Sequence, residues 1–317
     1  MKHQPIRDGR FAKFEHPQIT ATGETRASVA LKEPKTLWFN TGTLCNIACR
    51  NCYIESSPGN DRLVYLTVQE VVSYLRELRE LRWPVGEIGF TGGEPFMNPE
   101  IIDMARAALE DGFEVLILTN AMRPMMRRRM REGLQDLARA HAARLTLRVS
   151  LDHYDAARHD GERAKGSFAR TIEGMAWLRD NAIRMTVAGR TLWGETEARA
   201  RAGYAALFAR HGFDVDAEDP AALVLFPEMD ETVDVPEITT RCWDILNKDP
   251  AQVMCASSRM VVKRKGAEKP AVLACTLLAY SPEFELGETL SEAQREVFLN
   301  HPHCARFCVL GGASCSA

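Results

Sequence analysis

The sequence predicts an α/β fold, namely a partial (β/α)6 TIM-like barrel followed by a small cysteine-rich α+β module. Two observations support this prediction. Strand-like and helix-like segments alternate from residue 35 to about residue 235, which is typical of a parallel sheet with crossover helices. Beyond residue 240 the alternation ends, and six of the nine cysteines of the 317-residue chain lie there. We therefore expect an N-terminal arm over residues 1–34, a barrel over 35–235 and a second module over 236–317.

The predicted barrel has too few repeats to close. Its first helix begins after Thr67, an N-cap with Glu70 three residues later, and ends before Trp83-Pro84. Six repeats fall short of the eight that a closed barrel needs, so we expect an open partial barrel. The strands are predicted at 35–41, 85–91, 113–119, 145–151, 184–191 and 222–226. Five helices are predicted. They lie at 67–82, after a start at 98–100, in the basic segment that ends at about 142, at 167–181 and at 195–210.

The tail has its own pattern. Two short apolar runs at 261–263 and 271–273 flank a turn at 265–267, which predicts a β-hairpin bracketed by Cys255 and Cys275. Residues 291–299 are then predicted to form a short helix that leads into the terminal cysteines.

Charge and hydropathy exclude several classes of partner. The formal net charge of −3 gives no electrostatic reason to expect nucleic acid or an anionic membrane. The basic run at 123–131 continues with helical spacing through Leu134 and Leu137, which favours a solvated helix face. No apolar run reaches membrane-spanning length, and no secretory signal is recognised. We expect a cytoplasmic protein without nucleic acid or membrane partners.

Three cysteines directly after the first strand form the most informative motif. Cys45, Cys49 and Cys52 have C-x3-C-x2-C spacing, which lets three thiolates face one soft metal centre, as iron–sulfur clusters require. Three thiolates are one too few for a four-iron cubane, so one iron would keep an open position. A structural zinc site is the alternative, although such sites usually have four protein ligands.

The second strand ends in a second motif, Gly92-Gly93-Glu94. Its glycines allow a close approach of the backbone to a ligand, and its carboxylate lies at a strand end. A Gly-Gly-Glu turn alone is more often a plain turn. Because this turn follows the next strand after the cysteine loop, the two motifs together are much more specific for a functional site than either motif alone.

Together the two motifs resemble those of radical S-adenosylmethionine (radical SAM) enzymes. The resemblance implies that Cys45, Cys49 and Cys52 bind a 4Fe-4S cluster whose open iron binds SAM. One-electron reduction would cleave SAM to methionine and a 5'-deoxyadenosyl radical. The resemblance also assigns Gly92, Gly93 and Glu94 to the SAM amino group.

Further SAM contacts follow from the same resemblance. Asn120 ends the third strand and is assigned to cofactor binding. Ser150, at the end of the fourth strand, matches a serine that contacts the SAM ribose or carboxylate. Arg163 matches an arginine that pairs with the carboxylate. A plain strand-capping role for Ser150 remains an alternative. Many family members have an aromatic residue just before the third cysteine, where this chain has Asn51 and places Tyr53 after it.

The tail is similar to the twitch and SPASM extensions of the family, which hold auxiliary clusters. Six thiols are too few for two fully ligated four-iron clusters, so we expect one second 4Fe-4S cluster. Cys242, beside Trp243, is expected to be a buried thiol, and a structural zinc is the competing interpretation of the tail. The candidate ligands, of which four are needed, are Cys255, Cys275, Cys304, Cys308 and Cys315.

The predicted function is therefore that of a radical SAM oxidoreductase or bond-forming enzyme. Its radical would abstract a hydrogen atom from a small-molecule substrate, with the auxiliary cluster assisting oxidation or bond formation, and a flavodoxin or ferredoxin-type protein would supply the electron. Modification of a peptide or protein is one alternative. A non-catalytic iron–sulfur or zinc-stabilised binding protein is another, but such a protein would not need Gly92-Gly93-Glu94.

Overall fold

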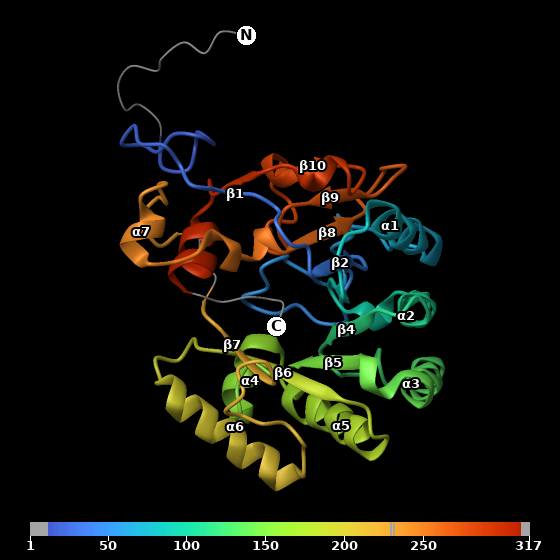
Figure 1. Cartoon of the computed structure of the whole chain (residues 1–317). Helices are drawn as coiled ribbons and strands as arrows, with labels where there is room; N and C mark the ends of the chain where they lie inside the picture. Colours follow the sequence, from blue (N-terminus) through green and yellow to red (C-terminus); the bar gives the residue numbers. More distant parts are fainter. Residues whose placement is uncertain (1–11, 229, 231, 312–317) are drawn as a thin grey trace.

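The computed structural model describes residues 12–228, 230 and 232–311, and its centre is one nine-stranded sheet (Figure 1). Six consecutive strands pair in parallel and in chain order, as the alternating sequence pattern predicts. They are β2 (Thr36–Asn40), β3 (Glu87–Thr91), β4 (Glu114–Thr119), β5 (Leu145–Ser150), β6 (Met185–Arg190) and β7 (Leu223–Phe226). In the described part of the chain, β7 and β10 are the two edges of the sheet, so the barrel stays open.

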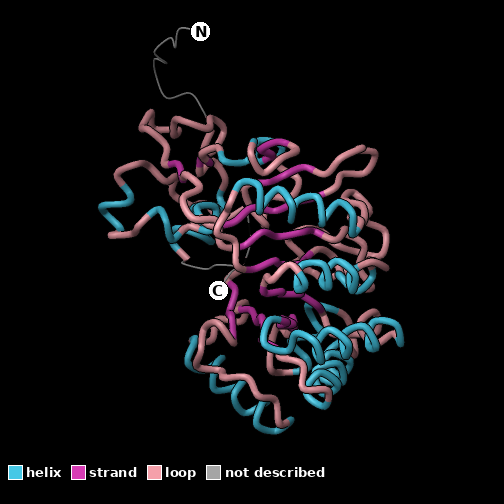
Figure 2. Tube along the Cα trace, turned by 45° about the vertical axis from the view of Figure 1, so that its right-hand side comes forward, coloured by secondary structure: helices cyan, strands magenta, loops and turns pink. Residues whose placement is uncertain are grey.

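Amphipathic helices connect these strands and cover the outside of the sheet (Figures 1 and 2). The first has the predicted capping box, because Glu70 N donates to Thr67 Oγ1 (3.3 Å) and Thr67 N donates to Glu70 Oε2 (2.8 Å). In α3 (Arg128–His141), Met130, Leu134 and Leu137 are buried. The arginines at 128, 129 and 131 are exposed, which confirms a solvated helix face for the part of the basic run from residue 128 on. The predicted helices are α1 (Val68–Leu81), α2 (Ile101–Glu110), α3 (Arg128–His141), α5 (Ser167–Asp180) and α6 (Glu197–His211). A short helix that was not predicted, α4 (Ala156–Arg163), follows β5.

The tail extends the same sheet. After α7 (Cys242–Leu246), the predicted hairpin forms from β8 (Ser258–Val262) and β9 (Ala271–Leu273), and β10 (Glu285–Gly287) adds a third antiparallel strand. The sequence did not indicate that β8 pairs in parallel with β2. This pairing places the tail beside the strand that leads into the cysteine loop.

The helix predicted over 291–299 is wrong. Residues Glu292–Gln294 form only a 3-10 turn, and β11 (Val297–Phe298) is a strand that pairs antiparallel with β1 (Ser28–Val29). Local spacing cannot reveal a strand whose only partner lies near the other end of the chain, because that pairing is set by tertiary contacts.

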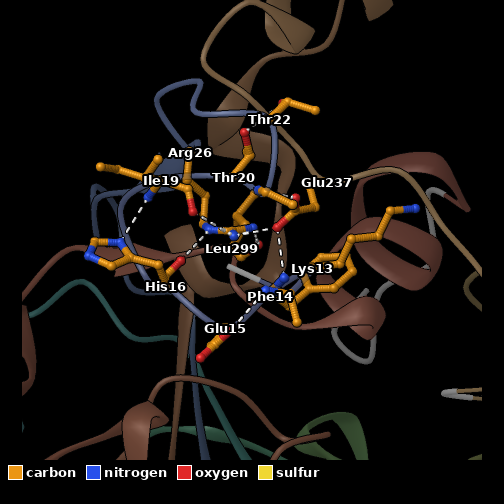
Figure 3. A network of polar contacts seen from close by, with 12 residues as sticks. Lys13, Phe14, Glu15, His16, Ile19, Thr20, Thr22, Arg26, Glu237 and Leu299 are labelled. Carbon is orange, nitrogen blue, oxygen red and sulfur yellow. Dashed lines mark hydrogen bonds and ion pairs between the residues drawn. The ribbon is translucent and has the colours of Figure 1, made fainter. Parts of the chain in front are cut away.

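The residues that precede the barrel are held to the tail by a buried charge pair (Figure 3). Arg26 has no exposed side-chain surface, and its Nη2 lies 2.5 Å from Glu237 Oε1. The same guanidinium donates to the carbonyl oxygens of His16, Ile19 and Leu299. Within the residues described, no helix has the length and apolar character that crossing a membrane requires.

Candidate active site

A cavity opens at the carboxyl ends of the parallel strands, where α/β folds place their ligands. It has about 1070 Å³ of empty space, including the part open to solvent. The residues predicted from the sequence that line it are Cys45, Cys49, Cys52, Gly92, Gly93, Asn120, Ser150 and Arg163.

The cysteine loop is held by main-chain contacts at its base and by α4 at its tip. Cys45 N donates to Ser57 O (3.1 Å). At the tip, Arg50 N donates to Glu162 O (2.8 Å) and Asn51 Nδ2 donates to Glu162 Oε2 (2.7 Å). The helix that sequence reasoning missed therefore positions the loop that carries the three thiols.

The three thiols share one wall of the cavity. Burial raises the pKa of Cys45 to about 12 and also raises the pKa of Cys49. A soft cation bound there would favour the thiolates that burial disfavours. In the described portion, no three Cys, His, Asp or Glu side chains converge on a single ion. A cluster does not require such convergence, because each thiolate bonds a different iron atom, and the donor set fits a cluster.

Gly92 and Gly93 bring β3 against the cysteine loop. Gly93 N donates to Gly42 O (2.8 Å), and Glu94 N donates to Leu44 O (3.2 Å). A Cβ atom on Gly92, whose φ is +137°, would lie 2.5 Å from Gly42 O. A Cβ on Gly93 would lie 2.3 Å from Leu44 O. Both positions require glycine, because two backbone segments meet there without room for a side chain.

Glu94 lies behind the cavity wall and is only 2% exposed. Its Oε1 accepts hydrogen bonds from Thr119 Oγ1 (2.8 Å) and Phe96 N (3.3 Å), and its Oε2 accepts one from Asn120 N (2.8 Å). Burial raises the pKa of Glu94 to about 7, although these hydrogen bonds oppose the shift. The carboxylate is thus fixed in orientation, and it links the Gly-Gly turn to the end of β4.

Asn120 and Arg163 are fixed by partners inside the site. Asn120 Nδ2 donates to Asn46 Oδ1 (2.9 Å) in the cysteine loop. Arg163 pairs with Asp152 through two bonds, Nε to Oδ2 (2.7 Å) and Nη2 to Oδ1 (2.9 Å). Burial alone would raise the pKa of Asp152, but the Arg163 charge and hydrogen bonds hold it below its ordinary value. Ser150 lines the cavity one residue beyond β5's last apolar position.

The remaining lining includes residues that no sequence pattern marked. Arg190 comes from β6 and Phe226 from β7, while Leu277 and Phe307 come from the tail. The Phe226 and Phe307 rings are stacked, with centroids 5.8 Å apart and an interplanar angle of 23°. The tail therefore supplies part of the wall of the cavity.

The tail cysteines that the structure describes are buried or half-buried. Cys255, Cys304 and Cys308 are buried, and Cys275 and Cys242 are half-buried. Burial raises the pKa of Cys304, and electrostatic repulsion from the Cys275 and Cys255 thiols raises it further. Cys308 follows on the same short helix, Cys304–Leu310. Cys315, the fifth predicted ligand, lies outside the described residues.

Comparison with curated proteins finds similarity over about half of the chain. The antilisterial bacteriocin subtilosin biosynthesis protein AlbA of Bacillus subtilis is 29% identical over 167 residues, covering 52% of this chain and 35% of AlbA. An AdoMet-dependent heme synthase of Nitratidesulfovibrio vulgaris is 26% identical over 180 residues, covering 54% of this chain and 44% of the synthase. The chain thus matches less than half the length of either relative.

Solved structures share the fold. Streptococcus suis SuiB bound to precursor peptide SuiA superposes with a TM-score of 0.60 at 12% identity, covering 84% of this chain and 66% of SuiB. AnSMEcpe with bound AdoMet superposes with a TM-score of 0.56 at 14% identity, covering 82% of this chain and 77% of anSMEcpe. The sequence model of the radical SAM superfamily matches residues 39–201, more than half of the chain, and the chain therefore belongs to that superfamily.

Proposed function

We propose that the protein is an enzyme that cleaves SAM reductively and abstracts a hydrogen atom from a small-molecule substrate, leading to oxidation or bond formation. One observation carries the proposal. The cysteine loop and Gly92-Gly93 line the same cavity and contact each other through main-chain atoms. A non-catalytic iron–sulfur or zinc-stabilised protein would need the cysteines but would have no use for this second loop.

Different residues of the cavity would bind the cluster and SAM. Cys45, Cys49 and Cys52 would hold the cluster, and the Gly92–Glu94 turn would take the amino group of SAM. When bound and reduced, the cluster would supply the electron that breaks a carbon–sulfur bond of SAM and so generates the 5'-deoxyadenosyl radical.

The other predicted contacts orient SAM in the same cavity. Ser150 would bind its ribose or carboxylate, and Asn120 fixes the adjacent loop. Arg163 would offer charge to the SAM carboxylate while its pairing with Asp152 holds the guanidinium in place. The stacked Phe226 and Phe307 would keep water away from the reacting atoms.

We propose a single auxiliary 4Fe-4S cluster in a twitch- or SPASM-like tail. The electrostatic interaction of Cys304 with Cys275 and Cys255 supports it, with Cys308 or Cys315 as the fourth ligand. Accepting an electron there would allow net oxidation of the substrate. Four thiolates complete the usual ligation of such a cluster.

Two relatives of this chain differ in the kind of product that their names state. One is a bacteriocin biosynthesis protein and the other a heme synthase. Modification of a peptide is therefore the second candidate. We further propose a cytoplasmic location, where thiols stay reduced, and a flavodoxin or ferredoxin-type electron donor.

Anaerobic reconstitution with iron and sulfide tests these assignments. The proposal predicts about eight iron atoms per chain for two four-iron clusters, and 5'-deoxyadenosine when SAM and a reductant are added. Replacing Cys45, Cys49 and Cys52 together by alanine should leave about four iron atoms and abolish that product. Cys242→Ala is the matched control and should behave as the wild type. Binding of zinc alone would reject the enzyme.

A further inference from the structure

We propose that Arg190 forms an anion-binding subsite for a carboxylate on the substrate, so that the substrate combines a carboxylate with an apolar or aromatic body. This inference rests on the proposed function, because it names the substrate class of the same cavity.

Arg190 is the last residue of β6 and lines the cavity. Its Nη1 donates to the main-chain oxygen of Asn51 (3.0 Å). Its Nε and Nη2 atoms are buried and have no hydrogen-bond partner among the described residues. A buried N–H group without an acceptor is destabilising, more so on a charged side chain. A ligand that supplies two acceptor oxygens would remove that cost.

Arg163, the other arginine that lines the cavity, differs from Arg190 because its guanidinium has a carboxylate partner. Arg163 already has its charge balanced by two hydrogen bonds to the Asp152 carboxylate. In the part of the chain that is described, the ion pair of Asp152 is with Arg163, and the Arg190 charge acts on Asp152 and on Cys49 only from beyond hydrogen-bond distance. A guanidinium fork matches a carboxylate through two parallel bonds. Of the two, Arg190 is the one with two buried donor atoms that have no acceptor among the described residues.

The surroundings of Arg190 define the rest of the ligand. Its neighbour in the sheet register is Phe226 of β7, whose ring stacks on Phe307. Leu277 and the small residue Ala188 also line the cavity. The wall on the β7 and tail side of the guanidinium is therefore apolar and partly aromatic, whereas Asp152 and Cys49 lie on its other side. A carboxylate attached to an apolar body fits it better than a free inorganic anion does.

Position along the sheet separates this subsite from Gly92 and Gly93, whereas Ser150 ends the neighbouring strand β5 and Arg190 N donates to Asp152 O (3.0 Å). Gly92 and Gly93 follow β3, and β6 is the third strand from β3. Adjacent strands are about 4.8 Å apart, so the two strand ends are separated by about 14 Å along the sheet. The contact with Asn51 nevertheless keeps Arg190 beside the cysteine loop. A ligand held by Arg190 would lie between the loop and the tail, where a substrate must be placed.

Ligand binding to the full chain, reconstituted and loaded with SAM, tests the subsite. The probes are 3-phenylpropionate and its amide, measured by isothermal titration calorimetry. We expect the acid to bind wild-type protein at least tenfold more tightly than the amide. Arg190→Gln should abolish that preference, and Arg190→Lys should keep only part of it because lysine cannot form the bidentate pair. The control is Arg184→Gln, an exposed arginine just before the same strand, which should keep the full preference.

Equal binding of acid and amide to the wild type would overturn the proposal, as would an unchanged preference in a folded Arg190→Gln or Arg190→Lys variant. Loss of SAM affinity in these variants, with probe binding intact, would assign Arg190 to the cofactor and also overturn it. An Arg190-dependent preference in a protein that forms no 5'-deoxyadenosine would uphold the subsite and reject the proposed radical function.

Discussion

Gly93→Ala probes the contact between β3 and the cysteine loop. The new Cβ would lie 2.3 Å from Leu44 O and 2.7 Å from Thr43 O, both main-chain atoms of the loop that carries the thiols. A backbone atom cannot turn aside as a flexible side chain can. The loop must therefore move away from β3 by several tenths of an ångström or more, and Cys45, one residue beyond Leu44, must move with it.

The cost follows from the geometry. Overpacking of a close contact typically costs about 1–3 kcal/mol. The shift in Tm per kcal/mol shrinks with chain length, and for 317 residues it is about 1.5 °C, so the variant should lose about 1.5–4.5 °C. Small displacements of a positioning group can cost up to about a hundredfold in reactivity. We expect SAM affinity to fall at least tenfold, which corresponds to about 1.4 kcal/mol.

The assay compares thermal unfolding and SAM binding of the reconstituted variant with those of Gly86→Ala. Gly86 lies just before the same strand, and no atom lies within 4 Å of a Cβ built there. The control should match the wild type in both measurements. Wild-type stability and SAM affinity in Gly93→Ala would refute the reasoning that the loop contact requires glycine.

Three further predictions concern other contacts. Glu94→Gln should weaken SAM binding and cost about 1–3 kcal/mol by calorimetry, because its amide nitrogen cannot accept the Asn120 N–H bond. Asp155→Ala removes the N-cap of α4 and should lower stability by about 0.5–2 kcal/mol, with faster iron loss from the first cluster under chelator. Glu237→Gln should cost about 3–5 kcal/mol by leaving buried Arg26 unpaired. Wild-type behaviour in any of these assays would contradict the corresponding assignment.

The Glu237 pair also sets a pH dependence. Burial alone would raise the pKa of Glu237, but its main-chain hydrogen bonds and Arg26 lower it below the ordinary 4.5. The unfolded carboxyl group then takes up a proton first, so the stabilisation is present above pH 4.5 and is lost as the pH falls through the folded pKa. Urea unfolding at a series of pH values should show a shallower acid slope for Glu237→Gln. An unchanged slope would exclude Glu237 as a source of acid sensitivity.

Local sequence signals predicted much of this molecule. The alternation of apolar strands with amphipathic helices gave the six parallel strands in order, and the Thr67 and Glu70 pattern gave the start of α1. The cysteine loop and Gly92-Gly93-Glu94 led to the superfamily, which is confirmed together with its four-iron cluster and SAM as cofactors. These signals are readable because each depends on residues a few positions apart.

Features set by distant contacts escaped prediction. The strand β11 pairs with β1, and β8 joins β2, through residues far apart in the chain. The helix α4, which Asp155 caps, has only one buried residue, His159. Its sequence therefore has no apolar periodicity from which a helix could be predicted. Arg190 and Phe307 line the same cavity only because the sheet and the tail bring them there. No spacing within the sequence encodes that placement.

The most direct test of the central claim is formation of 5'-deoxyadenosine by anaerobically reconstituted, reduced protein supplied with SAM. The account predicts this product in the wild type and its loss when Cys45, Cys49 and Cys52 are replaced together by alanine. Undiminished product from the triple variant, or no product from a wild type with a full complement of iron, would contradict the account.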